Sequence, residues 1–155
     1  MESFAELIKK RRSIRKFTNQ LLSPEQVESL LKAALMAPSS KRSNAWQFVL
    51  VENKEMLQKL ASCKKNGSSF LETAALAIVV LANPMESDVW VEDASVASIY
   101  IQLQAEDLGL GSCWCQIRNR ETAGETDSAQ YVRDLRDIPY QMEVLSIIGV
   151  GYKDQ

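Results

Sequence analysis

The sequence predicts a domain of the α/β or α+β class, in which helices cover a central sheet. Four short runs rich in β-branched or aromatic residues are separated by segments with the apolar spacing of helices. One such segment, residues 89–108, is apolar on most sides, as in a helix of the interior or of a subunit interface. The length and the hydrophobic fraction of 46% suit a sizeable core, so we expect residues 1–155 to form one domain.

The N-terminal part of the chain predicts two helices. Residues 3–10 place their apolar side chains on one face, as a helix does. The second helix begins at Ser23, which opens a Ser-Pro-Glu-Gln run that allows a capping box and puts proline at the first helical position. Pro38 limits the reach of this helix, because the residue before a proline disfavours the helical conformation.

The middle of the chain alternates between strands and helices. Residues 46–52 and 75–81 are predicted to be buried strands, the second because three consecutive residues are β-branched. Asn53 can cap a helix between them. Gly109 is expected to end the long helix over residues 89–108, because glycine adopts the left-handed conformation found at helix ends.

The last third of the chain predicts two further strands with one helix between them. The strands are expected over residues 112–117 and 143–150, and the helix over residues 128–136. With the earlier elements this gives four strands and five helices, and no repeat, linker or low-complexity segment interrupts them.

Composition excludes several classes of protein. The formal net charge is −2 and the pI is about 5.3, whereas nucleic-acid binders usually carry a strongly basic domain. The longest apolar stretch, residues 74–82, is too short to span a bilayer. Residues 1–6 are acidic and amphipathic and lack the basic and apolar regions of a signal peptide. We therefore expect a cytoplasmic protein that binds neither nucleic acid nor membrane.

Cysteine and histidine content limits the possible chemistry. The chain has three cysteines and no histidine, so we expect no disulfide framework and no metal site. Cys113 and Cys115 share a predicted strand, and we expect their thiols on opposite faces of it, which is poor geometry for one metal. We interpret all three cysteines as small apolar core residues. Redox or acid–base work then depends on a cofactor, a carboxylate, Tyr, Lys or water.

Two cationic segments carry the strongest functional signal. Residues 11–15, Arg-Arg-Ser-Ile-Arg, follow the first predicted helix, and residues 38–46, Pro-Ser-Ser-Lys-Arg-Ser-Asn-Ala-Trp, precede the first strand. Both combine cations and hydroxyls at an element boundary, where free backbone N–H groups can also bind phosphate. In a chain of net charge −2 this indicates a small anionic ligand. The alternatives are a solvated helix end favoured by the helix dipole and an ordinary polar loop.

The order of these motifs resembles the nitroreductase-like family of FMN-dependent oxidoreductases. It consists of an N-terminal helix, Arg-Arg-Ser-Ile-Arg-Lys-Phe, a Ser-Pro-capped helix, Ala-Pro-Ser-Ser, and an aromatic residue that opens a strand. Residues 107–114, Asp-Leu-Gly-Leu-Gly-Ser-Cys-Trp, match the segment at the end of the family's central helix. The resemblance covers nearly the whole chain. It implies a three-layer α+β fold with helices around a central mixed sheet, and a homodimer with FMN between the subunits.

The resemblance also assigns expected roles to the first cationic segment. Arg11 and Ser13 would bind the FMN phosphate and ribityl region, with Arg12 beside them. Arg15 would face the pyrimidine edge or the ribityl chain. These roles suit the residue types, because arginine offers a fork of charge-assisted donors to phosphate, and a cation near the pyrimidine edge favours the anionic reduced flavin.

Further cofactor contacts are implied elsewhere in the chain. Four residues would reach the flavin from the partner subunit: Pro38, Ser39, Ser40 and Arg42. Gln116 and Ile117 align with the segment whose backbone lies beside the reactive edge of the flavin ring. No catalytic side chain is implied, because the flavin carries the chemistry.

The chain departs from the family pattern in two respects. Arg42 stands where members commonly carry Asn, and Asn44-Ala45 replaces Gln-Pro before the tryptophan. Longer members also extend past the last strand and bring a basic residue back to the phosphate, whereas this sequence ends at Gln155. We expect Arg42 to substitute for that charge.

The implied activity is the reduction of a nitroaromatic, a quinone or another small electrophile. NADH or NADPH would transiently deliver the hydride to FMN, and use of one cleft by donor and acceptor in turn predicts ping-pong kinetics. The main alternative is a flavin carrier or redox sensor with little turnover. A third interpretation is a dimeric binding module for a different phosphorylated ligand.

Overall fold

The computed structural model describes residues 3–155; Met1 and Glu2, part of the segment weighed as a signal peptide, lie outside the described residues. The helices are α1 (Phe4–Lys10), α2 (Pro24–Leu35), α3 (Lys54–Leu60), α4 (Trp90–Asp107) and α5 (Ser128–Arg136). The strands are β1 (Trp46–Val51), β2 (Leu76–Ala82), β3 (Gly111–Gln116) and β4 (Glu143–Gly151). Two short 3₁₀ helices, η1 (Ser40–Arg42) and η2 (Ser69–Glu72), lie between these elements.

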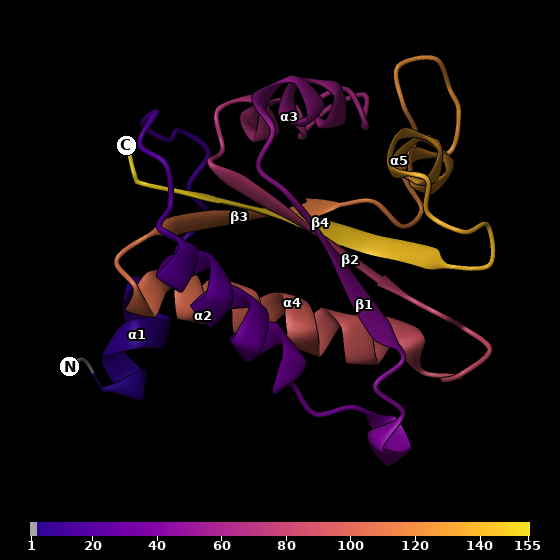
Figure 1. The fold of residues 1–155 in the computed structure, drawn as a ribbon, viewed down its shortest axis with the longest axis horizontal. Helices are drawn as coiled ribbons and strands as arrows, with labels where there is room; N and C mark the ends of the chain where they lie inside the picture. The colour runs from indigo at the N-terminus through magenta and orange to yellow at the C-terminus, as the bar shows by residue number, and fades with distance from the viewer. Residues whose placement is uncertain (1–2) are drawn as a thin grey trace.

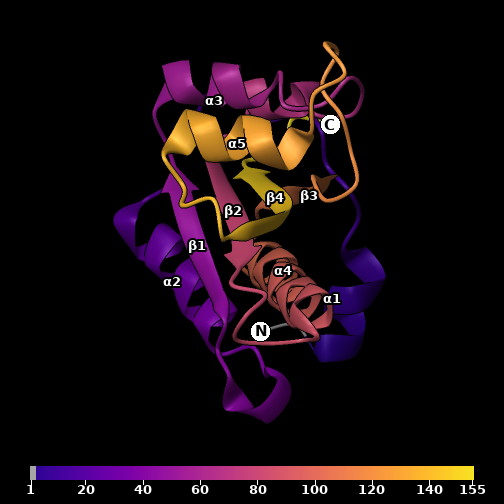
Figure 2. The same cartoon turned by 90° about the vertical axis from the view of Figure 1, so that its right-hand side faces the viewer.

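The strands form one sheet in the order β1-β2-β4-β3, with helices on both faces (Figure 1). Helices α1, α2 and α4 cover one face and α3 and α5 the other, which gives three layers (Figure 2). The α+β class is confirmed. Where a mixed sheet was expected, all three strand pairs are antiparallel, and the parallel contact among residues 3–155 is a single bridge between Ser13 and Ser112.

Local capping explains why the predicted boundaries hold. The Ser23 hydroxyl accepts the Gln26 N–H at 3.1 Å while the Gln26 side chain accepts the Ser23 N–H at 2.8 Å, so the capping box at the start of α2 is formed. The Asn53 side chain accepts the Met56 N–H at 3.0 Å at the start of α3. Gly109 ends α4 with a φ of 77°.

The sheet is buried on both faces, which divides the core into two halves. One half joins the sheet to α3, α5 and η2, and the other joins it to α2 and α4. Every residue of β2 is buried, as a strand covered on both faces requires. By contrast, no residue of α1 is buried. Within residues 3–155, no helix is long and apolar enough to cross a bilayer.

Strand β3 lies at an edge of the sheet, and the chain after α1 covers only its first part. The Ile14 N–H donates to the Ser112 carbonyl at 2.9 Å, so the backbone groups of Ser112 point away from β4. In an antiparallel pair this direction alternates from residue to residue. The N–H and C=O groups of Trp114 and Gln116 therefore also point toward the open edge.

Glycines in β3 and β4 leave room for two side chains of the segment that follows α1, and these side chains hold the segment in place. A Cβ atom at Gly111 would lie 2.8 Å from Cβ of Ile14, and one at Gly151 would lie 2.9 Å from Cδ1 of Phe17. Ile14 and Phe17 are both buried. The close approach of the backbone thus fixes the position of the chain that carries the arginines.

We predict that Gly111→Ala destabilises the protein by about 1–3 kcal/mol, because the added methyl group overpacks against Ile14. Gly124→Ala is the matched control, since its Cβ would approach the Thr122 hydroxyl oxygen no closer than 3.8 Å. Urea unfolding gives both values. An unchanged midpoint for Gly111→Ala would contradict the close packing described above.

Candidate functional site

The first cationic segment is held firmly between α1 and the edge of the sheet. Helix α1 ends at Arg11, whose N–H donates to the Leu7 carbonyl at 3.1 Å. Ser13 bridges Ser112, and the buried side chain of Ile14 anchors the chain between its neighbours. Arg12 and Arg15 consequently remain exposed, while Arg11 and Ser13 are half-buried.

The arginines of this segment are not neutralised by the protein. No carboxylate oxygen of residues 3–155 lies within 4 Å of the guanidinium groups of Arg11, Arg12 or Arg15. Three guanidinium groups and the Ser13 hydroxyl therefore remain available to a ligand. This donor set suits a phosphate, which guanidinium groups bind through charge-assisted hydrogen bonds.

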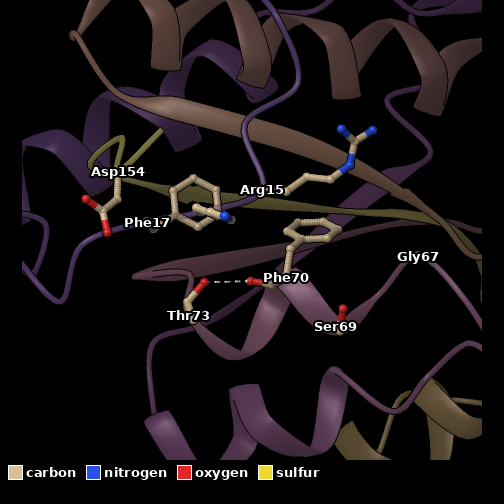
Figure 3. A pocket seen from close by; sticks show the side chains of 8 residues that line it. Arg15, Phe17, Gly67, Ser69, Phe70, Thr73 and Asp154 are labelled. Atoms are coloured by element: carbon tan, nitrogen blue, oxygen red, sulfur yellow. Dashed lines mark hydrogen bonds between the residues drawn. The ribbon is translucent and has the colours of Figure 1, made fainter.

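A hollow of about 400 Å³ adjoins Arg15. Figure 3 shows the Arg15 side chain reaching over the Phe70 ring, with Asp154 on the far side of Phe17. The residues that line the hollow are Arg15, Lys16, Phe17, Gly67, Ser69, Phe70, Thr73 and Asp154. An aromatic floor with a cation above it can accept a flat, electron-rich ring system.

The C-terminal residues brace this segment, which the sequence did not indicate. The Gln155 side-chain oxygen accepts the backbone N–H groups of Arg15 at 2.9 Å and of Lys16 at 3.2 Å. The Thr18 N–H donates to the Tyr152 carbonyl at 2.9 Å. The segment that follows β4 therefore runs alongside the cationic segment (Figure 1).

The second cationic segment forms a tight loop between α2 and β1. Pro38 follows the end of α2, and the Ser39 hydroxyl donates to the Asn44 side-chain oxygen at 2.9 Å and accepts the Asn44 N–H at 3.1 Å. Lys41, Arg42 and Asn44 have φ values of 53°, 53° and 46°. Non-glycine residues in this left-handed region each cost about 1 kcal/mol or more, so the surroundings must enforce the conformation.

A buried carboxylate, that of Asp93, enforces this left-handed loop conformation. Asp93 in the first turn of α4 is 5% exposed, and its two oxygens accept the Ser40 N–H at 2.9 Å and the Ser87 hydroxyl at 2.8 Å. Acidic residues in a first helical turn, here Glu92 and Asp93, ordinarily stabilise the helix N-terminus through its dipole. An acidic residue in a first helical turn is too common for its pattern to reveal a contact across 53 residues.

The two cationic segments lie at opposite ends of α4. Ser40 is tied to the first turn of this helix, and Ser13 bridges Ser112, which follows the helix C-terminus. Eighteen helical residues span about 27 Å. One chain therefore does not bring the two groups of expected ligands together (Figure 1).

Gln116 and Ile117, the two predicted flavin contacts near the end of β3, differ in the direction of their backbone N–H groups. The Ile117 side chain is fully buried and its N–H donates to the Leu145 carbonyl at 3.0 Å. Gln116 lies at the end of β3 with its N–H toward the open edge, and its side-chain oxygen accepts the Trp114 indole N–H at 2.9 Å. Of the two aligned residues, Gln116 is thus the one whose N–H faces outward.

The prediction for the cysteine faces is wrong. Cys113 and Cys115 both join Cys63 in the core beneath α3, whereas Trp114 packs on the α4 side. The reason is the two-residue period of a strand, which places residues i and i+2 on the same face. Burial raises the pKa of the Cys113 thiol, and the Arg15 charge and the Ser13 hydroxyl oppose this rise only in part. Within residues 3–155 no cluster of ligands suited to a metal is formed.

An apolar surface remains uncovered on the α1 and α4 side. Phe4, Ile8 and Tyr100 are 65%, 52% and 37% exposed. A groove of about 400 Å³ runs along this surface, lined by Phe4 and Leu7 of α1, Ala33 of α2, and Tyr100, Leu103, Gln104 and Asp107 of α4. Contiguous apolar surfaces of this kind typically mark an interface.

Comparison with known proteins identifies relatives of this chain. The model of the Nitroreductase family matches residues 8–66 and 62–152. A protein of Archaeoglobus fulgidus, provisionally named an NADH dehydrogenase/NAD(P)H nitroreductase, is 38% identical over 160 residues, which cover 100% of this chain and 88% of that protein.

Solved structures agree with this placement. An FMN-dependent nitroreductase from Clostridium difficile superposes with a TM-score of 0.96 at 46% identity, over 98% of this chain and 88% of that one. The NADPH:FMN oxidoreductase of Vibrio harveyi, solved in complex with NAD⁺, superposes with a TM-score of 0.81 at 27% identity, over 97% of this chain and 69% of that one. The family match spans most of the sequence, and the chain belongs to the Nitroreductase family.

Proposed function

We propose that this protein is an FMN-dependent oxidoreductase that uses NADH or NADPH to reduce nitroaromatic, quinone or similar small electrophilic acceptors. The observation that carries the proposal is the group of three arginines next to the open edge of β3, which have no carboxylate partner among residues 3–155. Relatives named as nitroreductases and FMN reductases support the same cofactor and chemistry.

The residues present fit the two ends of an FMN molecule. Arg11, Arg12 and Ser13 supply cationic and hydroxyl donors for the phosphate. The hollow under Arg15 supplies an aromatic floor for a ring system. A cation at that place stabilises negative charge on the pyrimidine edge, so Arg15 would raise the reduction potential of the bound flavin. The outward N–H of Gln116 can donate to an acceptor atom on the ring.

When bound, FMN supplies the hydride-transfer chemistry, first accepting from the nicotinamide and then donating to the acceptor. The protein binds the cofactor, orients its ring and keeps one face open to the two substrates. No side chain is required as an acid or a base if water supplies the protons. Because donor and acceptor share one cleft, they must occupy it in turn.

The active form that we propose is a homodimer. The two predicted ligand groups are separated by the length of α4, about 27 Å, so both can contact one flavin only if they come from different chains. In a two-fold dimer the same surface meets itself, and each loop at one end of α4 approaches the other subunit's ligand group. The uncovered apolar surface of α1 and α4 is suited to that contact.

We predict that Arg11→Ala weakens FMN binding by about 10- to 100-fold, because a hydrogen bond between charged groups contributes about 1.5–3 kcal/mol. Arg120→Ala is the matched control, since Arg120 is exposed and its side chain, among the described contacts, donates to the adjacent Asn119 carbonyl at 3.0 Å. Quenching of flavin fluorescence on titration measures both affinities. Equal affinities for the two variants would remove the first cationic segment from the phosphate site.

We predict ping-pong kinetics for the loaded enzyme. Double-reciprocal plots against the nicotinamide concentration, at several concentrations of a quinone, should give parallel lines. Under anaerobic conditions the flavin absorbance should bleach within seconds of adding NADH or NADPH. Intersecting lines would contradict the shared cleft, and bound flavin that stays yellow would indicate a carrier or a sensor.

A further inference from the structure

Asp93 is a buried carboxylate without a cationic partner. No Lys or Arg nitrogen of residues 3–155 lies within 4 Å of it. Its stabilisation comes from the N–H of Ser40, the hydroxyl of Ser87 and the N-terminus of α4. A carboxylate is costly to bury, so its retention among apolar neighbours calls for a role that a neutral residue cannot fill.

The carboxylate acts on the loop that carries the second group of cations. It fixes Ser40, the residue directly before Lys41 and Arg42, both of which are exposed and left-handed. The Ser39 and Asn44 side chains close the same loop from the other end. Within the described residues the Ser43 hydroxyl of this loop is buried without a hydrogen-bond partner.

These contacts constrain where the two cations can point. A left-handed residue that is free to relax returns to the more stable right-handed or extended region. Hydrogen bonds of Asp93 to Ser40 and Ser87 oppose this relaxation by tying the loop to the first turn of α4 and to the segment that precedes it. The backbone that carries the two cations is therefore ordered before any ligand arrives, which reduces the entropic cost of binding.

We infer that Asp93 is a positioning residue for the cofactor phosphate. Through Ser40 and Ser87 it holds the loop of residues 39–44 so that Arg42 and Lys41 face the phosphate group bound by the partner subunit's Arg11. The inference rests on the proposed function, because it requires an FMN site shared between two chains.

The neighbouring acid offers a matched comparison. Glu92 lies one residue earlier in the same helical turn but is exposed, and it makes no hydrogen bond or ion pair to the loop among the described contacts. Glu92→Gln and Asp93→Asn therefore remove the same charge from the same helix end. Only Asp93→Asn alters a group that contacts the loop, because the amide leaves a neutral, weaker oxygen acceptor for the Ser40 N–H and replaces the oxygen that accepts the Ser87 hydroxyl with an NH₂ donor.

The test compares FMN with riboflavin, which lacks the phosphate. The wild-type protein and the Glu92→Gln, Asp93→Asn, Ser87→Ala and Arg42→Ala variants are titrated with each flavin, and the ratio of the two dissociation constants is measured. We expect Asp93→Asn to weaken FMN binding by about tenfold and riboflavin binding by less than twofold, which collapses the preference for the phosphorylated flavin. A general loss of structure would weaken both flavins equally.

The Ser87→Ala variant and a double variant test the inference independently of how well Asp93→Asn folds. Ser87→Ala retains the carboxylate and should reduce the preference in the same direction, so it serves if Asp93→Asn folds poorly. Combining Asp93→Asn with Arg42→Ala should add little to Arg42→Ala alone, because both act on one phosphate contact. If the ratio of the FMN and riboflavin dissociation constants is unchanged in Asp93→Asn and Ser87→Ala, the inference about Asp93 is overturned and the proposed function stands. A wild-type protein that binds neither flavin would overturn the proposed function as well.

Discussion

The length of α4 governs how this chain can form a site. The helix spans about 27 Å and separates two cationic segments, residues 11–15 and 38–46, with only the 22 residues 16–37 between them in the sequence. Each segment is tied to its own end of the helix, one by the Ser13–Ser112 bridge and the other by the Asp93–Ser40 hydrogen bond. A single chain keeps these residues apart, and the two-fold dimer that we propose would bring them together. Function thus depends on a distance that the core holds fixed.

The core is well suited to hold that distance. Strands β2 and β4 are buried along almost their whole length, and helix layers cover both faces of the sheet. Burial of large apolar side chains contributes about 1.5–3 kcal/mol each, so the scaffold tolerates polar and strained features at its edges. Three such features lie in or beside the segments where ligands are expected: the open edge of β3, the left-handed residues Lys41, Arg42 and Asn44, and the buried Asp93.

Sequence reasoning recovered the elements that depend on local interactions. The capping box at Ser23, the Asn53 cap and the stop at Gly109 are each formed within a few residues, and the predicted boundaries agree with the structure to within about two residues. The antiparallel sheet order, the return of Gln155 to Arg15 and the contact between Asp93 and Ser40 join residues far apart in the chain. No local pattern carries that information. The error over Cys113 and Cys115 was one of strand geometry, because the period of two already places them together.

The central claim is that one flavin site is built by two chains, and subunit mixing tests it most directly. Two differently tagged chains, one with Arg11→Ala and one with Arg42→Ala, are combined and the heterodimer is purified. In each parent homodimer, both sites carry the same single substitution. If the site is shared, the heterodimer has one intact and one doubly altered site, and it should bind one FMN per dimer at a concentration where the parents bind little. If heterodimer binding instead matches that of the parents, each site lies within a single chain and the account is contradicted.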